Sequence, residues 1–137
     1  MFNLTKTFTS TNDIHITPIL MDNEPIFLPS ELEEQLGYER LAQAITKSPN
    51  MRNGKDFYKI EGDKLRELKE LLIRGSQTPI AASVNSLIVL KESGLNKLLL
   101  RSDKPECQKF ADWIVDEVLP SIRKTGSYEI IPNYRKQ

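Results

Sequence analysis

Hydrophobic residues are densest between residues 86 and 128, where their spacing changes from that of a strand to that of a helix. Residues 87–90 form a short apolar run rich in β-branched side chains, which predicts a buried strand. Residues 92–100 then predict a helix, and residues 105–119 a longer one. The apolar residues of the longer helix share one face and are expected in the core: Phe110, Trp113, Ile114 and Val118.

The N-terminal part of the chain predicts a β-hairpin. Residues 1–12 are polar with scattered apolar positions, so we expect them to be loose or to form a weak edge strand. Apolar residues alternate with polar ones over residues 14–19, and a second apolar run follows at 26–28, as is typical of strands with one buried face. The segment Asp22-Asn23-Glu24 supplies turn residues between them. Prolines beside these strands are expected to keep the hairpin at an edge or near strand ends.

Two short helices are expected next. Ser30 and Glu33 match the capping-box pattern S-x-x-E of a helix start, and Gly37 suits the helix end. Residues 39–47 predict a second helix. Its inward positions are expected to be Leu41, Ala44 and Ile45. Two helices joined by a glycine turn fit both a helix-turn-helix and a plain helical hairpin, and we favour the plain hairpin because the motif is so general.

The middle of the chain predicts a loop, a strand and a helix. Residues 48–56 have loop composition, with a turn at Asn53-Gly54, and residues 57–60 indicate a short strand. Leucines on one helical face predict a helix over 63–74, with its first residue as the N-cap and the glycine that follows it as the stop.

These elements predict a single α+β domain, with a small antiparallel sheet and several short helices packed against it. With 137 residues and 39% apolar content, the chain is long enough to bury a sizeable core. We expect the domain to span residues 13–128. A flexible or weakly ordered N-terminus at 1–12 would precede it, and a C-terminal tail or the start of a linker at 129–137 would follow.

Composition limits the compartment and the kinds of partner. Nineteen basic and nineteen acidic residues cancel, which argues against bulk binding to nucleic acid but leaves room for a local basic patch. A single cysteine excludes an internal disulfide and suits a reducing cytoplasm. No apolar run approaches the roughly 20 residues needed to span a bilayer, and the N-terminus lacks a secretory signal. We therefore expect a cytoplasmic protein without membrane attachment.

The sequence offers no pattern typical of a catalytic or metal site. The only imidazole is His15, in an expected edge strand, and the only thiol is Cys107, near the start of the last predicted helix. A helix N-terminus can activate a thiol, but free cysteines are more often small buried residues. Phosphate-binding glycine loops, histidine metal spacings and paired catalytic carboxylates are missing. We expect neither an enzyme nor a bound cofactor or metal.

Basic side chains in the C-terminal half suggest a binding surface instead. Lys97 and Arg101 are four residues apart on a predicted helix and so project from the same side, with Lys104 just beyond. Arg123 and Lys124 follow a proline that is expected to end or kink the last helix. Together such cations can neutralise phosphates, which gives salt-dependent affinity. Any one of them taken alone is more often an ordinary solvated charge.

A long ordered series of motifs runs through the same region: E-x-G-L, L-x-x-R-S, K-P, F-x-x-W and V-L-P-S-I-R-K-T-G-x-Y. In this chain they are Glu92, Gly94 and Leu95; Leu98, Arg101 and Ser102; Lys104 and Pro105; Phe110 and Trp113; and Val118 to Tyr128. The series closely resembles the signature of the BRO-N domain, found at the N-terminus of phage and prophage antirepressors and of baculovirus BRO proteins. The resemblance covers about residues 14–128.

The resemblance implies a phage-type transcriptional regulator with a DNA-binding BRO-N domain. Antirepressors disable a phage repressor, commonly by protein–protein contact, and many carry a second domain after BRO-N. The sequence fits both a domain excised from a longer protein and a short family member. The leading hypothesis is DNA binding through seven basic residues: Arg52, Lys55, Lys97, Arg101, Lys104, Arg123 and Lys124.

The alternative is a protein-binding antirepressor that inactivates a phage repressor without contacting DNA. Three consecutive leucines, Leu98, Leu99 and Leu100, cannot all face one core, so they predict an exposed apolar patch. Subunits can bury such a patch between them, and we therefore expect a homodimer or higher oligomer. Trp113 is interpreted as a core anchor rather than a platform for stacking bases, because its neighbours are apolar.

Overall fold

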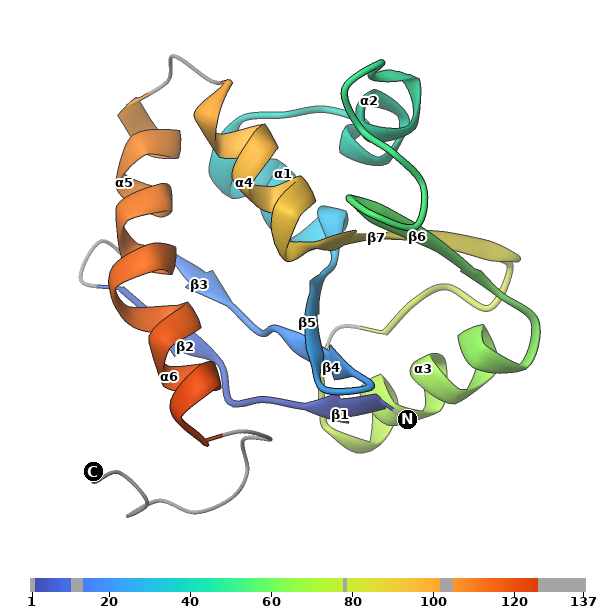
Figure 1. Ribbon diagram of the computed structural model, residues 1–137. Helices are drawn as coiled ribbons and strands as arrows, with labels where there is room; N and C mark the ends of the chain where they lie inside the picture. The colour runs from blue at the N-terminus through green and yellow to red at the C-terminus, as the bar shows by residue number, and fades with distance from the viewer. Residues whose placement is uncertain (1, 11–13, 78, 102–104, 126–137) are drawn as a thin grey trace.

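The computed structural model describes residues 2–10, 14–77, 79–101 and 105–125. Five short antiparallel strands form a sheet with the spatial order β1-β4-β5-β7-β6 (Figure 1). Their bounds are Phe2–Leu4 (β1), Ile19–Met21 (β4), Glu24–Phe27 (β5), Ser86–Lys91 (β7) and Phe57–Glu61 (β6). Two further short strands pair with each other: Phe8–Thr9 (β2) and His15–Ile16 (β3). The predicted α+β class is confirmed.

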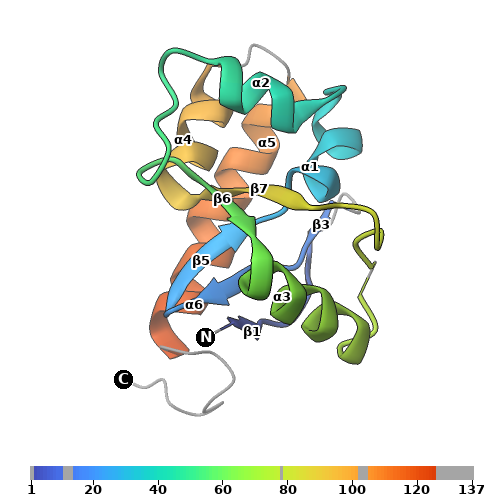
Figure 2. The same cartoon turned by 90° about the vertical axis from the view of Figure 1, so that its right-hand side faces the viewer.

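Helices cover both faces of the sheet (Figures 1 and 2). They are Pro29–Leu36 (α1), Leu41–Lys47 (α2), Gly62–Arg74 (α3), Glu92–Leu100 (α4), Pro105–Trp113 (α5) and Leu119–Thr125 (α6), with a π-helical segment, Ile114–Val118, between the last two. None of the helices in the described residues is both long and apolar enough to cross a membrane.

Alternation along the strands divides the core into two clusters. Ile26 and Val89 face one side of the sheet, where they pack with the leucines of α3. Phe27 and Leu90, the next residues along the same strands, face the other side and pack with residues of α1, α2, α4, α5 and α6. Adjacent strand residues point to opposite faces, so each of these strands contributes to both clusters.

A hairpin forms around the predicted turn, but its first strand is Ile19–Met21 instead of residues 14–19, because His15–Ile16 pairs with β2. The hairpin lies inside the sheet rather than at its edge. Strands β4 and β5 are joined by Asp22 and Asn23, whose φ angles of 53° and 70° suit a two-residue hairpin turn. The N-terminal segment, expected to be loose or a weak edge strand, supplies β1 as the outer neighbour of β4. Pro25 is tolerated in an inner strand because β7 pairs with β5 only from Ile26 onward.

The capping box predicted at Ser30 and Glu33 does not form. Pro29 occupies the first helical position of α1, where its missing N–H costs nothing, and the N-cap is Leu28, two residues before the predicted Ser30. The Glu33 carboxylate instead accepts the Leu41 N–H at 2.7 Å, so it caps the start of α2. The predicted end of α1 is confirmed, because Gly37 is left-handed with φ 75°.

Two smaller predictions are corrected, and a third is confirmed. Ala44 is exposed on α2, although Leu41 and Ile45 are buried as expected. Asp63 lies inside the first turn of α3, after Glu61 at the N-cap, and accepts a hydrogen bond from the Arg66 side chain. Gly75 ends α3 as predicted, although its φ of −87° is not left-handed.

The C-terminal helix does not end at Pro120 but continues to Thr125. The π-helical segment directly precedes this proline, and the Leu119 N–H donates to the Ile114 carbonyl, five residues back. A wider π turn accommodates the proline ring, which would otherwise collide with a carbonyl of the preceding turn.

The leucine patch predicted on α4 reduces to a single residue. Leu98 and Leu99 are buried in the core of this chain, and only Leu100 is exposed, at 80%. This removes most of the apolar surface on which the expected self-association depended. Self-association itself stays a prediction.

Trp113 is a core residue, as predicted. It is 7% exposed and packs edge-to-face against Phe110, with ring centroids 5.8 Å apart and an interplanar angle of 86°. Both rings belong to the cluster that holds α5 against the sheet and the neighbouring helices.

We predict that Trp113→Ala lowers the free energy of unfolding by about 3–5 kcal/mol, because it leaves a large cavity beside Phe110. Urea unfolding followed by circular dichroism measures the change. Lys109→Ala, at an exposed position of the same helix, is the control and should have little effect. A loss below about 1 kcal/mol for the tryptophan variant would contradict its place in the core.

Candidate nucleic-acid interface

One buried carboxylate joins the 48–56 loop to helix α4. Asp56 is completely buried at the end of this loop, directly before β6. Its Oδ2 accepts hydrogen bonds from Lys97 Nζ at 2.8 Å and from the Arg52 N–H at 2.9 Å. Its Oδ1 lies 2.8 Å from Ser93 Oγ. These partners come from the loop itself and from α4.

The environment of Asp56 keeps its carboxylate ionised. Burial alone would raise the pKa of this group, because a carboxylate is poorly solvated inside a protein. The hydrogen bonds from Lys97, the Arg52 N–H and Ser93, together with the charge of Lys97, outweigh burial and lower the pKa from 3.8 to about 2. Removing one partner of such a pair would leave a buried charge uncompensated.

The backbone of the loop is bonded to the same helix and to strand β7. Lys97 Nζ donates to the Asn50 carbonyl at 2.9 Å. Lys91, at the end of β7, donates from Nζ to the Gly54 carbonyl at 3.3 Å and from its N–H to the Asp56 carbonyl at 2.9 Å. The loop is therefore fixed at several points along its length.

The N-terminal turn of α4 approaches the loop closely. Ser93 Oγ lies 2.7 Å from the Lys55 carbonyl oxygen and shares its proton between that oxygen and the Asp56 carboxylate. A Cβ at Gly94 would overlap the carbonyl oxygen of Asp56. The glycine of the E-x-G-L motif thus allows the helix to pack against the loop backbone.

Four of the seven predicted DNA-binding residues line one surface depression of about 450 Å³. The loop contributes Arg52 and Lys55, the C-terminal half of α4 contributes Lys97, and Arg101 directly follows that helix. Its other lining residues are Pro49, Asn50 and Leu100. The fold thereby brings together basic residues that are far apart in the sequence.

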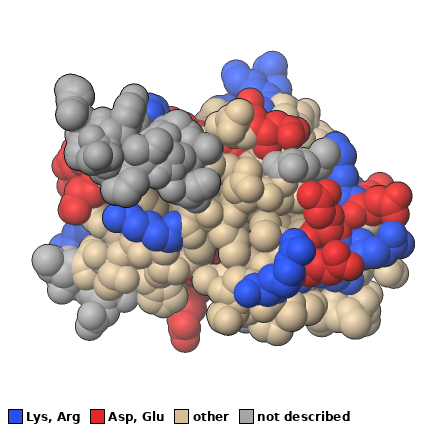
Figure 3. All heavy atoms as spheres, turned by 90° about the horizontal axis from the view of Figure 1, so that it is seen from below, with Lys and Arg blue, Asp and Glu red and all other residues tan. Residues whose placement is uncertain are grey.

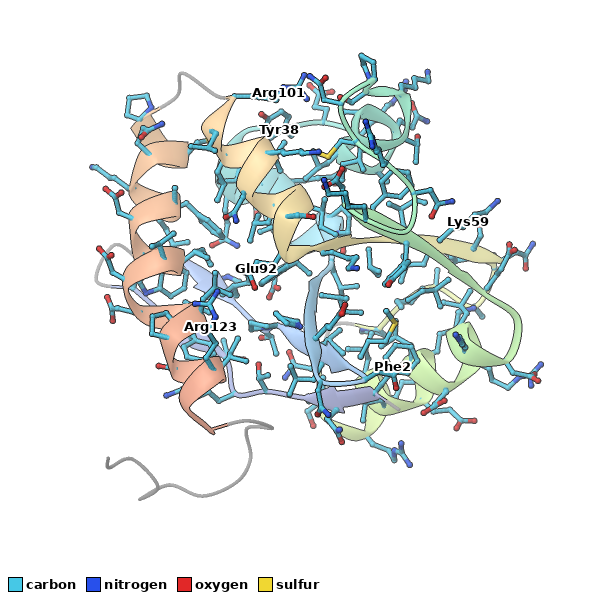
Figure 4. All side chains as sticks on the ribbon, in the orientation of Figure 1. Phe2, Tyr38, Lys59, Glu92, Arg101 and Arg123 are labelled. Atoms are coloured by element: carbon cyan, nitrogen blue, oxygen red, sulfur yellow. The ribbon has the colours of Figure 1, made fainter. Side chains whose placement is uncertain are left out.

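These four basic side chains differ in their exposure and in the hydrogen bonds and ion pairs that they already make within the chain. Lys97 is committed to Asp56 and the Asn50 carbonyl. Arg101 is exposed, and its Nη1 donates to Ser48 Oγ at 2.9 Å (Figure 4). Arg52 and Lys55 are exposed, and neither side chain forms an ion pair within the described residues.

The remaining predicted residues are not brought to this depression. Arg123 lies on α6 and pairs with Glu92, at the opposite end of α4, with Nη2 and Oε2 2.7 Å apart (Figure 4). Lys104 lies outside the described residues, as does the side chain of Lys124.

A face away from this depression has mixed charge. In Figure 3, acidic and basic side chains are interspersed on the side that carries α3, with uncharged surface beside them. Within the described part of the chain, no group of three or more His, Cys, Asp and Glu residues is placed to hold a metal ion. Cys107 is buried.

Comparison with known proteins places this domain in a family. Residues 15–120, which include both the 48–56 loop and α4, match the model of the BRO family, N-terminal domain. The chain belongs to this family. The resemblance inferred from the motifs is thereby confirmed.

Proteins similar to this chain occur in viruses and in a bacterium. Protein 201R of Invertebrate iridescent virus 6, a Bro-N domain-containing protein, is 30% identical over 108 residues, which cover 78% of this chain and 26% of the relative. An uncharacterized protein of Haemophilus influenzae is 40% identical over 55 residues, 40% of this chain and 27% of the relative. The Bro-N domain-containing protein 019R of Invertebrate iridescent virus 3 is 38% identical over 56 residues, 41% of this chain and 14% of the relative. The chain thus spans only 14–27% of these relatives, and no solved structure matches it.

Sequence reasoning missed Asp56, the residue that organises this part of the BRO-N domain. An aspartate in a segment rich in Asn and Gly is typical of a solvated turn. Nothing in the sequence around Asp56 therefore predicts that its side chain is buried. A partial signal lay in Ser93 and Lys97, which are four residues apart and so lie on one side of α4. That spacing indicates a shared partner but does not identify it.

We predict that Asp56 makes the stability of the domain depend on pH in acid. Its pKa is lower in the folded than in the unfolded chain, so its contribution is complete above about pH 4 and is lost as the pH falls toward 2. Urea unfolding at a series of pH values should show a steeper acid loss for the wild type than for Asp56→Asn.

The control for this comparison is Asp112→Asn, at an exposed position of α5, which should keep the wild-type pH dependence. Burial raises the pKa of Glu31, which contributes with the opposite sign. Because Glu31 is present in all three proteins, its contribution cancels in the comparison. Parallel acid profiles for the wild type and Asp56→Asn would contradict the ion pair.

Proposed function

We propose that this chain is the DNA-contacting domain of a phage-type transcriptional regulator of the antirepressor kind, with a binding rather than a catalytic role. The BRO-N family, which is associated with phage and viral regulators, supports the regulatory part. The observation that carries the DNA part is the convergence of Arg52, Lys55, Lys97 and Arg101 on one depression. Asp56 balances the charge of Lys97, so three further cations of this neutral chain line the depression, and they suit an anionic ligand.

Three acidic groups in this part of the domain are paired with cations of the chain, one of them with Lys97 itself. Asp56 is buried and paired with Lys97. Glu92 is paired with Arg123 at 2.7 Å, and Glu24 with Lys91 at 3.4 Å. A phosphate that approaches Lys55 or Arg101 would therefore meet little unbalanced negative charge. Each phosphate neutralised would release condensed counterions, which makes the affinity depend on salt.

The test is a fluorescence titration of a random-sequence duplex at several salt concentrations. We predict that Lys55→Ala combined with Arg101→Ala lowers the magnitude of the log affinity–log salt slope by about 2, because each phosphate contact contributes about 0.9. The control, Lys64→Ala with Arg74→Ala, removes two exposed charges from α3, on the other face of the sheet.

The control should keep the wild-type slope. Equal slopes for the two double variants would contradict the placement of the interface. A folded wild-type domain that binds no duplex at low salt would overturn the DNA-binding role altogether.

A second candidate is a protein-binding antirepressor, which the exposure of Leu100 favours. This side chain is 80% exposed and lines the same depression as the basic residues. An exposed leucine with cations beside it suits a partner that presents an apolar residue and acidic groups, for which we propose a phage repressor. Capture from a lysogenic host extract separates the candidates. Nuclease treatment should release partners held through DNA and retain a repressor bound directly.

A further inference from the structure

The backbone of residues 50–55 is immobilised while its polar side chains face outward. The carbonyl groups of Asn50, Gly54 and Lys55 accept hydrogen bonds from Lys97, Lys91 and Ser93. Within the segment, the Lys55 N–H donates to the Arg52 carbonyl at 3.2 Å. The Gly54 N–H donates to the carbonyl of Phe57, the first residue of β6, at 2.7 Å. Immobilising a loop before it binds reduces the entropy cost of binding.

The side chains that this loop presents are those that recognise bases. Asn50, Arg52, Asn53 and Lys55 are all exposed. An arginine can donate two hydrogen bonds to the O6 and N7 of guanine, and an asparagine can pair with the N6 and N7 of adenine. These contacts are available only in the major groove of duplex DNA, where each base pair is distinguishable.

The space around Gly54, at the tip of the loop, is open, so a ligand can approach the loop backbone closely. Gly54 has a φ of 91°, and a Cβ placed on it would meet nothing within 4 Å. Lys55 and Arg101 line the neighbouring depression, where they can neutralise phosphates beside a groove. The loop thus offers Arg52 and Asn53 for base contacts, with two cations nearby for the DNA backbone.

We propose that residues 50–55 enter the major groove of duplex DNA, where Arg52 and Asn53 recognise base edges while Lys55 and Arg101 hold flanking phosphates. This rests on the proposed DNA-binding function and adds sequence selectivity to it. Asp56 and α4 hold the backbone of the loop, and the side chains that contact bases therefore project from a rigid segment.

The test is selection of bound sequences from a random duplex pool by the wild type, Arg52→Lys and Asn53→Ala. Arg52→Lys keeps the charge but loses the planar two-donor fork. Both variants should bind random duplex within about twofold of the wild type, since neither loses a phosphate-neutralising charge. Each should enrich a motif that differs from the wild-type motif at one or two positions.

Enrichment of the same motif by the wild type and both variants would overturn the proposal. A wild type that binds random duplex but enriches no motif would also overturn it and leave the proposed DNA-binding function intact. A wild type that binds no duplex would overturn both. Urea unfolding of each variant confirms that its domain is folded.

A chemical substitution tests which groove is used. Replacing the purines of the selected motif by their 7-deaza analogues removes the N7 acceptors and leaves the minor groove unchanged. We expect the wild-type affinity for the substituted site to fall by about tenfold or more, as for the loss of one bidentate contact. Unchanged affinity would rule out the major-groove contact.

Discussion

The carboxylate of Asp56 is the interaction on which the candidate site depends. It is the only acidic group in the described residues that is completely buried, and its position would be unfavourable without the cation and the N–H that it meets. The 48–56 loop therefore cannot move away from α4 without exposing or unpairing a charge. A segment whose composition is that of a mobile surface loop becomes a fixed part of the domain.

Helix α4 connects this loop to the rest of the fold. It follows β7 without an intervening residue, so its direction is set by the middle of the sheet. One side of its first turn bonds to the loop through Ser93, and Glu92 in the same turn pairs with Arg123 of α6. Its buried leucines anchor it in the core. The basic residues at its C-terminal end are thus placed by contacts made elsewhere along the helix.

Local patterns predicted most of the elements, and the errors arose where distant segments meet. The strand at 87–90 and the helix at 92–100 follow from periodicity and are confirmed. The hairpin was expected at an edge or near strand ends, and the weak edge strand expected within residues 1–12 is β1. Nothing local indicates that β1 pairs with the hairpin and so places it inside the sheet. The capping box at Ser30 failed for a local reason instead, because Pro29 starts the helix and the N-cap is Leu28.

The candidate site was predictable only in part, for the same reason. Spacing on one helix indicated that Lys97 and Arg101 share a side, but not that a loop 40 or more residues earlier would join them. Lys97 was interpreted as a possible phosphate contact, and its pairing with Asp56 depends on burial that only the fold creates. The two exposed loop cations, Arg52 and Lys55, were named from their local charge alone.

Hydrogen exchange at the Arg52 amide is the most direct test that the buried Asp56 carboxylate fixes the 48–56 loop. This N–H belongs to an exposed residue of a surface loop, yet it donates to the buried Asp56 carboxylate at 2.9 Å. We expect strong protection of this amide at neutral pH in the wild type and loss of that protection in Lys97→Met, which unpairs the carboxylate. Exchange of the wild-type amide as fast as in an unstructured peptide would contradict it.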